Sequence, residues 1–86
     1  MPRRATKLLE DMRRSTANWK RYDLDTLYYG FGFEIRVGKK HDIAKHPEYP
    51  QLRATLPNKH PYLANEFIRT AVKLIDQLQQ LSKKSG

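Results

Sequence analysis

The chain has 86 residues, which is enough for one domain with a single hydrophobic core. It contains no cysteine, so disulfides, thiolate metal sites and cysteine nucleophiles are excluded, and a reducing cytoplasmic location is expected. Seventeen Lys and Arg against nine Asp and Glu give a formal net charge of +8, which favours a nucleic-acid partner. No apolar run is long enough for a signal peptide or a membrane span, so we expect a soluble protein without membrane contact.

The first predicted element is a helix over residues 5–14. Its apolar side chains recur at the spacing of one helix face, at Ala5, Leu8, Leu9 and Met12. Basic side chains far outnumber acids here, so residues 1–22 are predicted to form a basic helical extension, either packed on the domain or mobile as an arm. Trp19, the only tryptophan, is expected to anchor the extension by packing, with base stacking as the alternative.

A second short helix is predicted to begin at Asp23, because aspartate is a good N-cap residue. Four residues repeat the helical spacing, namely Leu24, Leu27, Tyr28 and Phe31. Gly30 and Gly32 follow, and either can adopt the left-handed conformation that ends a helix.

Three strands are predicted next, over residues 33–37, 41–46 and 52–56. Apolar and polar residues alternate in the first and third strands, which is the pattern of a half-buried strand. A turn at residues 38–40 joins the first two strands, and Pro47 and Pro50 interrupt the pairing before the third. The strands should therefore form an antiparallel meander.

A long helix is predicted over residues 63–81, followed by a frayed tail over residues 82–86. The element order is then α-α-β-β-β-α, and the fold class is α+β, with a three-stranded antiparallel sheet backed by helices on one face. The other face of such a sheet is open to solvent. If the apolar alternates point inward, the open face carries Glu34, Arg36, Arg53 and Thr55.

The candidate for a catalytic residue is His41, which follows a basic turn. No two histidines have metal-ligand spacing, and His41 and the adjacent Asp42 should point to opposite sides of a strand, so no metal site is predicted. Metal-independent RNA cleavage needs a group that moves protons near neutral pH and cations that stabilise the phosphorane. The hypothesis is that His41 acts as general acid or base. The RNA- or phosphate-binding candidates are Lys39, Lys40, Lys45, Arg36 and Arg53.

The alternative for His41 is that it is an exposed hairpin residue without a catalytic role. His46 and His60 each precede a proline, and both are interpreted as turn or loop residues.

Several segments occur in the same order as in the HicA family of bacterial toxins. Residues 24–33 resemble the family's first helix and its exit into a strand, and residues 41–47 resemble its "His, strand, His-Pro" segment. Residues 52–57 resemble its third strand, residues 71–75 resemble its closing helix, and residues 7–24 look like an extension found in one branch. The stretch from Leu24 to Leu78 thus resembles a HicA-like toxin.

This resemblance implies that residues 23–81 form a double-stranded-RNA-binding-domain-like fold. It also implies the toxin of a type II toxin–antitoxin system, a cofactor-free endoribonuclease that cleaves mRNA with His41 and is neutralised by a HicB-like antitoxin protein. The chain departs from the family just before the histidine, where Lys39 and Lys40 replace Gly-Ser. Two other functions stay open: a non-catalytic RNA- or DNA-binding module of the same fold, and a protein-interaction domain for an acidic partner.

Overall fold

The computed structural model describes residues 3–57 and 64–85. The elements are α1 (Arg3–Arg14), α2 (Arg21–Gly30), β1 (Glu34–Arg36), β2 (His41–Lys45), β3 (Arg53–Pro57) and α3 (Asn65–Ser85). This order confirms the predicted α+β class and the α-α-β-β-β-α arrangement. The sheet order is β1-β2-β3, with both neighbouring pairs antiparallel, as expected for a meander.

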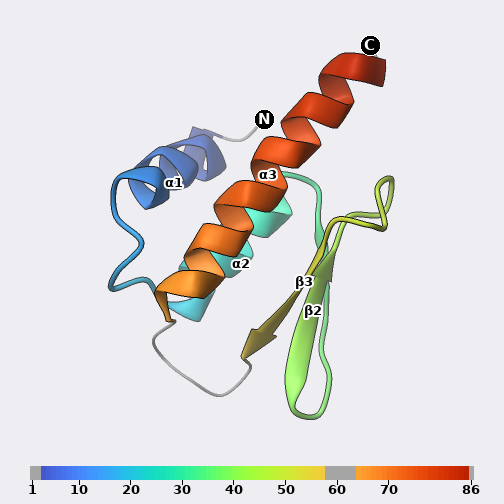
Figure 1. The fold of residues 1–86 in the computed structure, drawn as a ribbon. Coiled ribbons are helices and arrows are strands. Elements are labelled where there is room, and N and C mark those ends of the chain that lie inside the picture. The colour runs from blue at the N-terminus through green and yellow to red at the C-terminus, as the bar shows by residue number, and fades with distance from the viewer. Residues whose placement is uncertain (1–2, 58–63, 86) are drawn as a thin grey trace.

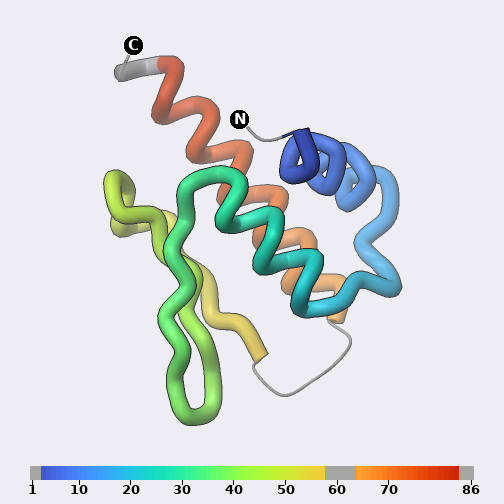
Figure 2. Tube along the Cα trace, turned by 180° about the vertical axis from the view of Figure 1, so that it is seen from behind, coloured from blue at the N-terminus to red at the C-terminus, as the bar shows by residue number. Residues whose placement is uncertain are grey.

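The elements form three layers (Figure 1). The sheet lies on one side, α2 and α3 pack together in the middle, and α1 lies on the far side of these two helices. Seen from behind, β1, α2 and α1 lie side by side across the molecule (Figure 2). One hydrophobic core joins all three layers, because buried residues of every helix and of the sheet belong to a single cluster.

Helix α1 is an integral part of this core. Ala5, Leu9 and Met12 are buried, and Leu8 packs against the cluster from a half-buried position, as the apolar spacing predicts. An ion pair between Arg13 and Asp76 also joins α1 to α3. Of the two possibilities for the basic extension, packing on the domain is therefore the one observed.

The chain turns between α1 and α2 through a left-handed residue, Asn18, with φ of 66°. Trp19 is half-buried against the core, and its indole Nε1–H donates to the carbonyl of Ser15 at 2.8 Å. Helix α2 begins at Arg21, so the prediction that Asp23 is its N-cap was wrong. Asp23 instead lies one turn inside, where its carboxylate accepts the Lys20 backbone N–H at 3.2 Å.

Gly32 ends helix α2 in the left-handed conformation, with φ of 87°. The Gly32 N–H donates to the carbonyl of Tyr29, and the Phe33 N–H donates to the carbonyl of Tyr28, which together form a Schellman cap. A Cβ at position 32 would lie 3.2 Å from Nε2 of His46, so both the backbone conformation and the space favour glycine.

Strand β1 is shorter than predicted. Phe33 lies before the strand and is buried in the core. Val37 lies after the strand, and 79% of its surface is exposed. The prediction that the apolar alternates of this strand point inward was therefore wrong for Val37. The backbone leaves the sheet after Arg36 because the next turn is held by a side chain, with the Gly38 N–H donating to Asp42 at 3.1 Å.

Helix α3 covers the sheet with an apolar stripe. Its buried residues are Ile68, Ala71, Leu74, Ile75 and Leu78. The helix runs beyond the expected end at Leu81 to Ser85, through most of the predicted tail. Lysine is a good helix former, and its positive charge stabilises a helix near the C-terminus. The helix therefore continues beyond its last apolar residue. The predicted helical residue Leu63 lies outside the described residues.

Candidate nucleic-acid interface

The face of the sheet opposite the helices carries most of the predicted site. Strand register places Lys45 between Glu34 and Arg53 in one row across the sheet. The next row joins Arg36, Ile43 and Thr55. All of these side chains are exposed except Ile43, which is half-buried, so the predicted open face is confirmed.

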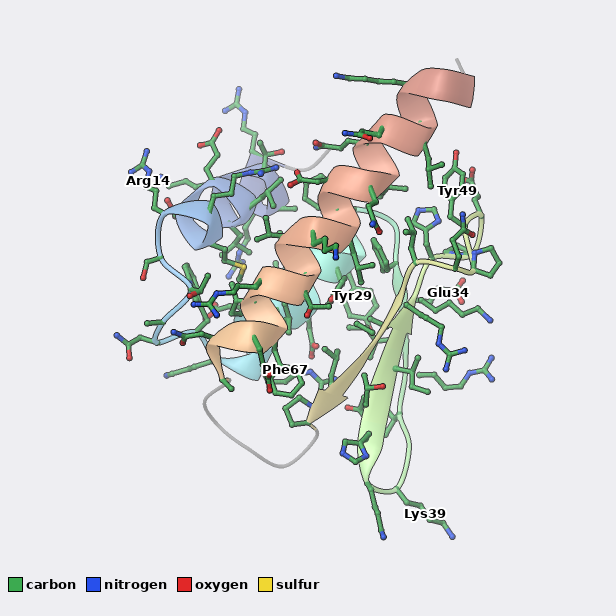
Figure 3. All side chains as sticks on the ribbon, viewed as in Figure 1. Arg14, Tyr29, Glu34, Lys39, Tyr49 and Phe67 are labelled. Carbon is green, nitrogen blue, oxygen red and sulfur yellow. The ribbon has the colours of Figure 1, made fainter. Side chains whose placement is uncertain are left out.

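The open face is positively charged. Arg36, Lys45 and Arg53 form no ion pair with any residue in the described ranges 3–57 and 64–85, so their charges are available to a ligand. Glu34 is the single carboxylate in these two rows. Glu34 lies on the side of the sheet that faces away from the helices (Figure 3).

A hollow of about 310 Å³ lies on this face, which is within the size range of small-ligand sites. It is lined by Glu34, Ile35, Arg36, Ile43, Lys45, Pro47 and Arg53. Three cations thus surround a small apolar surface. Phosphate groups are attracted by such cations, and the flat apolar part of a base or ribose can cover Ile43 and Pro47.

His41 lies at the other end of the same face. It is the first residue of β2, pairs with Pro57 of β3 and is exposed, whereas the adjacent Asp42 is buried on the helix side. The predicted opposite orientation of these two side chains is thus confirmed. The imidazole of His41 hydrogen-bonds to no other described residue, and Lys39 and Lys40 are exposed in the adjoining turn.

The cations are spread along the strands and do not converge on His41. Lys45 is four residues after His41 on β2, which corresponds to ~14 Å at the ~3.4 Å rise of an antiparallel strand. Lys45 and its neighbour Arg53 are therefore better placed for a neighbouring phosphate than for the one at His41. Arg36, one row closer, and the turn lysines Lys39 and Lys40 are the cations nearest to His41 along the sheet.

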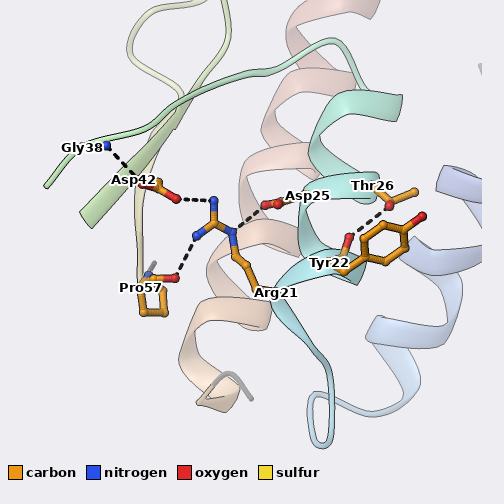
Figure 4. A network of polar contacts seen from close by, with 7 residues as sticks. All are labelled: Arg21, Tyr22, Asp25, Thr26, Gly38, Asp42 and Pro57. Carbon is orange, nitrogen blue, oxygen red and sulfur yellow. Dashed lines mark hydrogen bonds and ion pairs between the residues drawn. The ribbon is translucent and has the colours of Figure 1, made fainter. Parts of the chain in front are cut away.

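An ion-pair network supports the backbone on both sides of His41 (Figure 4). The Arg21 guanidinium of α2 lies 2.7 Å from the Asp42 carboxylate and donates to the carbonyl of Pro57 at 2.8 Å. Asp42 follows His41 in the chain, and Pro57 is its partner across the sheet. Arg21 also donates to Asp25 at 2.6 Å, so the network fixes both neighbours of His41 to α2.

The guanidinium of Arg21 stays positively charged in this network. Partial burial lowers the pKa of the Arg21 guanidinium, but hydrogen bonds to Asp25 and Asp42 outweigh this and raise the pKa above its ordinary value. Asp42 is buried and paired with Arg21, so its charge does not offset those of the nearby lysines.

The turn before His41 is tightly closed. The second Asp42 oxygen accepts the Gly38 N–H at 3.1 Å, and a Cβ at position 38 would lie only 2.3 Å from the His41 carbonyl oxygen. Any side chain at position 38 would thus push the histidine backbone away. Gly38 is required here by this close approach.

Arg21 was not among the predicted site residues, because it was assigned to the N-terminal extension. A signal for it was nevertheless present in the sequence. The alternation that turns His41 outward turns Asp42 inward, and a buried carboxylate requires a cationic or hydrogen-bonding partner. The sequence indicates that a partner is needed, but only the fold brings α2 close enough to supply it.

His46 does not lie on the open face. His46 is in the loop after β2, as predicted, and is buried between Phe33 and Tyr49, with its Nδ1 accepting the Glu48 N–H at 3.1 Å. His60 lies outside the described residues. Within residues 3–57 and 64–85, no three His, Cys, Asp or Glu side chains gather closely enough to hold a metal ion.

No helix in the described part of the chain is both long and apolar enough to cross a membrane. No protein-family model, curated protein or solved structure matches the chain.

Proposed function

We propose that this protein is a HicA-like toxin, an RNA-binding domain that cleaves mRNA without a metal and uses His41 as general acid or base. One observation carries the proposal: His41 is exposed on the same open sheet face as Arg36, Lys45 and Arg53, three cations that form no ion pair within the described part of the chain. RNA lying along this face would contact the cations through its phosphates and present one ribose to the histidine.

The chemistry at His41 is a proton transfer. In cleavage by the neighbouring 2′-hydroxyl, a base removes the hydroxyl proton while oxygen attacks phosphorus, and an acid protonates the departing 5′-oxygen. An exposed imidazole can do either near neutral pH. Lys39 and Lys40 in the adjoining turn would offset the charge on the phosphorane, and the Arg21–Asp42 pair would hold the backbone that carries the imidazole.

The proposal includes a double-stranded-RNA-binding-domain-like fold and a neutralising partner. The α-β-β-β-α order of the elements from α2 onward and the open basic sheet face support the fold assignment. A HicB-like antitoxin with an acidic surface would inhibit by covering Arg36, Lys45, Arg53 and His41 together, because charge complementarity favours that face.

A non-catalytic RNA-binding module is the second candidate. It is favoured by the environment of His41, whose imidazole no other described residue hydrogen-bonds. Catalytic histidines are usually oriented by a second group, although substrate can supply that contact. On this alternative the open face binds RNA through the same cations and leaves it intact.

The deciding experiment is induction of the wild-type gene and of His41→Ala in bacteria, with growth and total RNA followed together. Arrest with RNA loss in the wild type alone is the expected result, since general acid–base groups contribute about 10²–10⁴-fold to rate. Because His41 is exposed, the variant should fold, and circular dichroism of both purified proteins is the control.

Equal RNA loss from both proteins would remove His41 from the mechanism. No RNA loss from either, with RNA still bound by both, would establish the non-catalytic module instead. The third function considered, binding of an acidic protein, would be indicated by the absence of RNA binding at low salt, where phosphate contacts are strongest.

A further inference from the structure

Two exposed tyrosines lie on one stripe of α2. Tyr22 has 64% of its surface exposed and Tyr29 has 58%, and with Val37 they are the large hydrophobic residues most exposed in the described part of the chain. They are seven residues apart, which is two helical turns, so both point away from the core on the same side of the helix. Tyr28, which follows a different stripe, is fully buried.

Cations of α1 border this stripe. The guanidinium carbon of Arg4 lies 5.8 Å from the centre of the Tyr22 ring, within the range of a cation–π contact. Arg3 and Lys7 are exposed on the same helix, and none of these three forms an ion pair with a residue in the described ranges. The surface thus combines aromatic faces with unneutralised positive charge.

Helix α2 carries two carboxylates, Asp23 and Asp25, beside this charge. Asp25 is paired with Arg21, whereas Asp23 accepts the Lys20 backbone N–H and keeps its negative charge. The attraction for a polyanion approaching the tyrosines therefore comes from the cations of α1 and not from α2 itself.

We infer that the outer face of α2 is a stacking surface for single-stranded RNA, with Tyr22 and Tyr29 each taking a base and Arg4 contacting the phosphates beside them. Base–aromatic stacking next to Arg and Lys is how proteins bind single strands with little sequence preference. The inference rests on RNA being the ligand, as in the proposed function, but it does not depend on cleavage.

The position of the stripe connects it to the open sheet face. Figure 2 shows β1, α2 and α1 side by side, so a strand leaving the sheet past β1 reaches α2 next and then α1. Tyr22 and Tyr29 are ~10 Å apart along the helix axis, about three times the ~3.4 Å spacing of stacked nucleotides. The two rings would therefore take bases that are not neighbours in the strand.

A protein partner would require a different arrangement of side chains on this surface. Tyrosine and arginine are also common in protein interfaces, but such interfaces place them around a well-packed apolar centre. The described residues of the stripe are Tyr22, Asp25, Thr26 and Tyr29, with no aliphatic side chain among them. Because the Asp25 carboxylate is paired with Arg21 and a cation of α1 lies beside the Tyr22 ring, the separate rings favour RNA.

The test is binding of a fluorescein-labelled single-stranded RNA of mixed sequence to proteins that all carry His41→Ala, so that the RNA stays intact. The double variant Tyr22→Ala/Tyr29→Ala should bind roughly tenfold more weakly for each ring lost. The matched control Tyr22→Phe/Tyr29→Phe keeps both rings and should bind like its parent. Arg4→Gln should lower the salt dependence of binding by roughly one phosphate contact.

Ultraviolet crosslinking with mass spectrometry supplies a second readout, in which adducts at Tyr22 or Tyr29 are expected. Equal RNA affinity of the alanine and phenylalanine variants, without adducts on α2, would overturn the inference and leave the proposed function standing. No RNA binding by the parent protein would overturn both. An alanine variant that keeps its RNA affinity and loses an acidic protein partner would assign the face to that protein instead.

Discussion

Arg21 and Asp42 form an ion pair that is shielded from water, with 17% and 7% of the two side chains exposed. The Arg13–Asp76 pair, in contrast, leaves 43% and 42% exposed. Removing one member of a buried pair leaves the other charge without compensation, whereas an exposed pair is replaced by water at little cost. The two pairs therefore differ in their effect on stability, although both join separate parts of the chain.

Arg21→Met should lower the free energy of unfolding by about 3 kcal/mol, because it leaves the buried Asp42 carboxylate and the Pro57 carbonyl without their partner. The matched substitution Arg13→Met should cost less than about 1 kcal/mol. Urea denaturation of both variants measures the difference. Equal losses would show that the Arg21 network contributes no more than a surface ion pair.

Tyr28 is a second residue whose burial has a measurable cost. Its hydroxyl is buried and has no hydrogen-bond partner within the described ranges, and burial raises the pKa of Tyr28 above the ordinary 10.0. Above pH 10 a tyrosine in the unfolded chain loses its proton while Tyr28 in the folded protein keeps it. The folded state then binds more protons, so stability falls as pH rises above 10.

Tyr28→Phe should therefore raise the free energy of unfolding by about 1 kcal/mol at neutral pH, because an unpaired buried hydroxyl is removed. It should also reduce the loss of stability above pH 10. Urea midpoints at neutral and alkaline pH measure both effects. The exposed Tyr29→Phe is the control, and an alkaline loss as large in Tyr28→Phe as in the wild type would contradict the assignment.

At the scale of elements, α1 determines whether the N-terminal segment can be separated from the domain. Met12 is fully buried where α1 meets the middle layer, and Ala5 and Leu9 are buried beside it. Deleting apolar volume at such a site costs transfer free energy and leaves a cavity. The basic character of α1 belongs only to its outer face.

Met12→Ala should destabilise the whole protein by about 2–4 kcal/mol, whereas Lys7→Ala on the exposed face of α1 should change stability little. A single cooperative transition at lower urea concentration is the expected result for Met12→Ala. If α1 unfolded separately, with an unchanged transition for the remainder, the single-core description would be incorrect.

Strong periodic signals predicted the elements well, while their ends depended on contacts that sequence does not contain. The apolar spacing along each of the three helices and the strand pattern of residues 33–56 predicted every element and the order of the elements. Strand β1 ends before Val37 because Gly38 bonds to Asp42, and α2 begins before Asp23 because that carboxylate caps from inside the helix. Both boundaries follow from single hydrogen bonds.

Over the whole molecule, positive charge lies on two opposite sides, the open sheet face and the outer surface of α1, with α2 and α3 between them (Figure 1). Alternation along the strands placed Arg36 and Arg53 on one face correctly, since it depends only on the two-residue period of a strand. It could not give the distances of Arg36 and Arg53 from His41, because these depend on strand register. Contacts between distant segments, such as the ion pair of Arg21 with Asp42, could not be predicted from the sequence either.

RNA binding should depend on salt in proportion to the phosphates contacted. Replacing Arg36, Lys45 and Arg53 together with glutamine should lower the slope of log affinity against log salt by about 2, at ~0.7 per single-strand phosphate. Titrations at several salt concentrations measure this. Because all three side chains are exposed, folding should be unaffected, and a slope unchanged from the wild type would exclude the open face from phosphate contact.

The pairing of the first helix with the last has a consequence for synthesis on the ribosome. Helix α3 supplies Ile68, Ile75 and Leu78 to the core, and its Asp76 bonds to Arg13, 63 residues earlier in the chain. A nascent chain that has not yet extended through α3 cannot cover the inner side of its sheet or the inner side of α1. The domain should thus acquire its structure only after α3 has been synthesised.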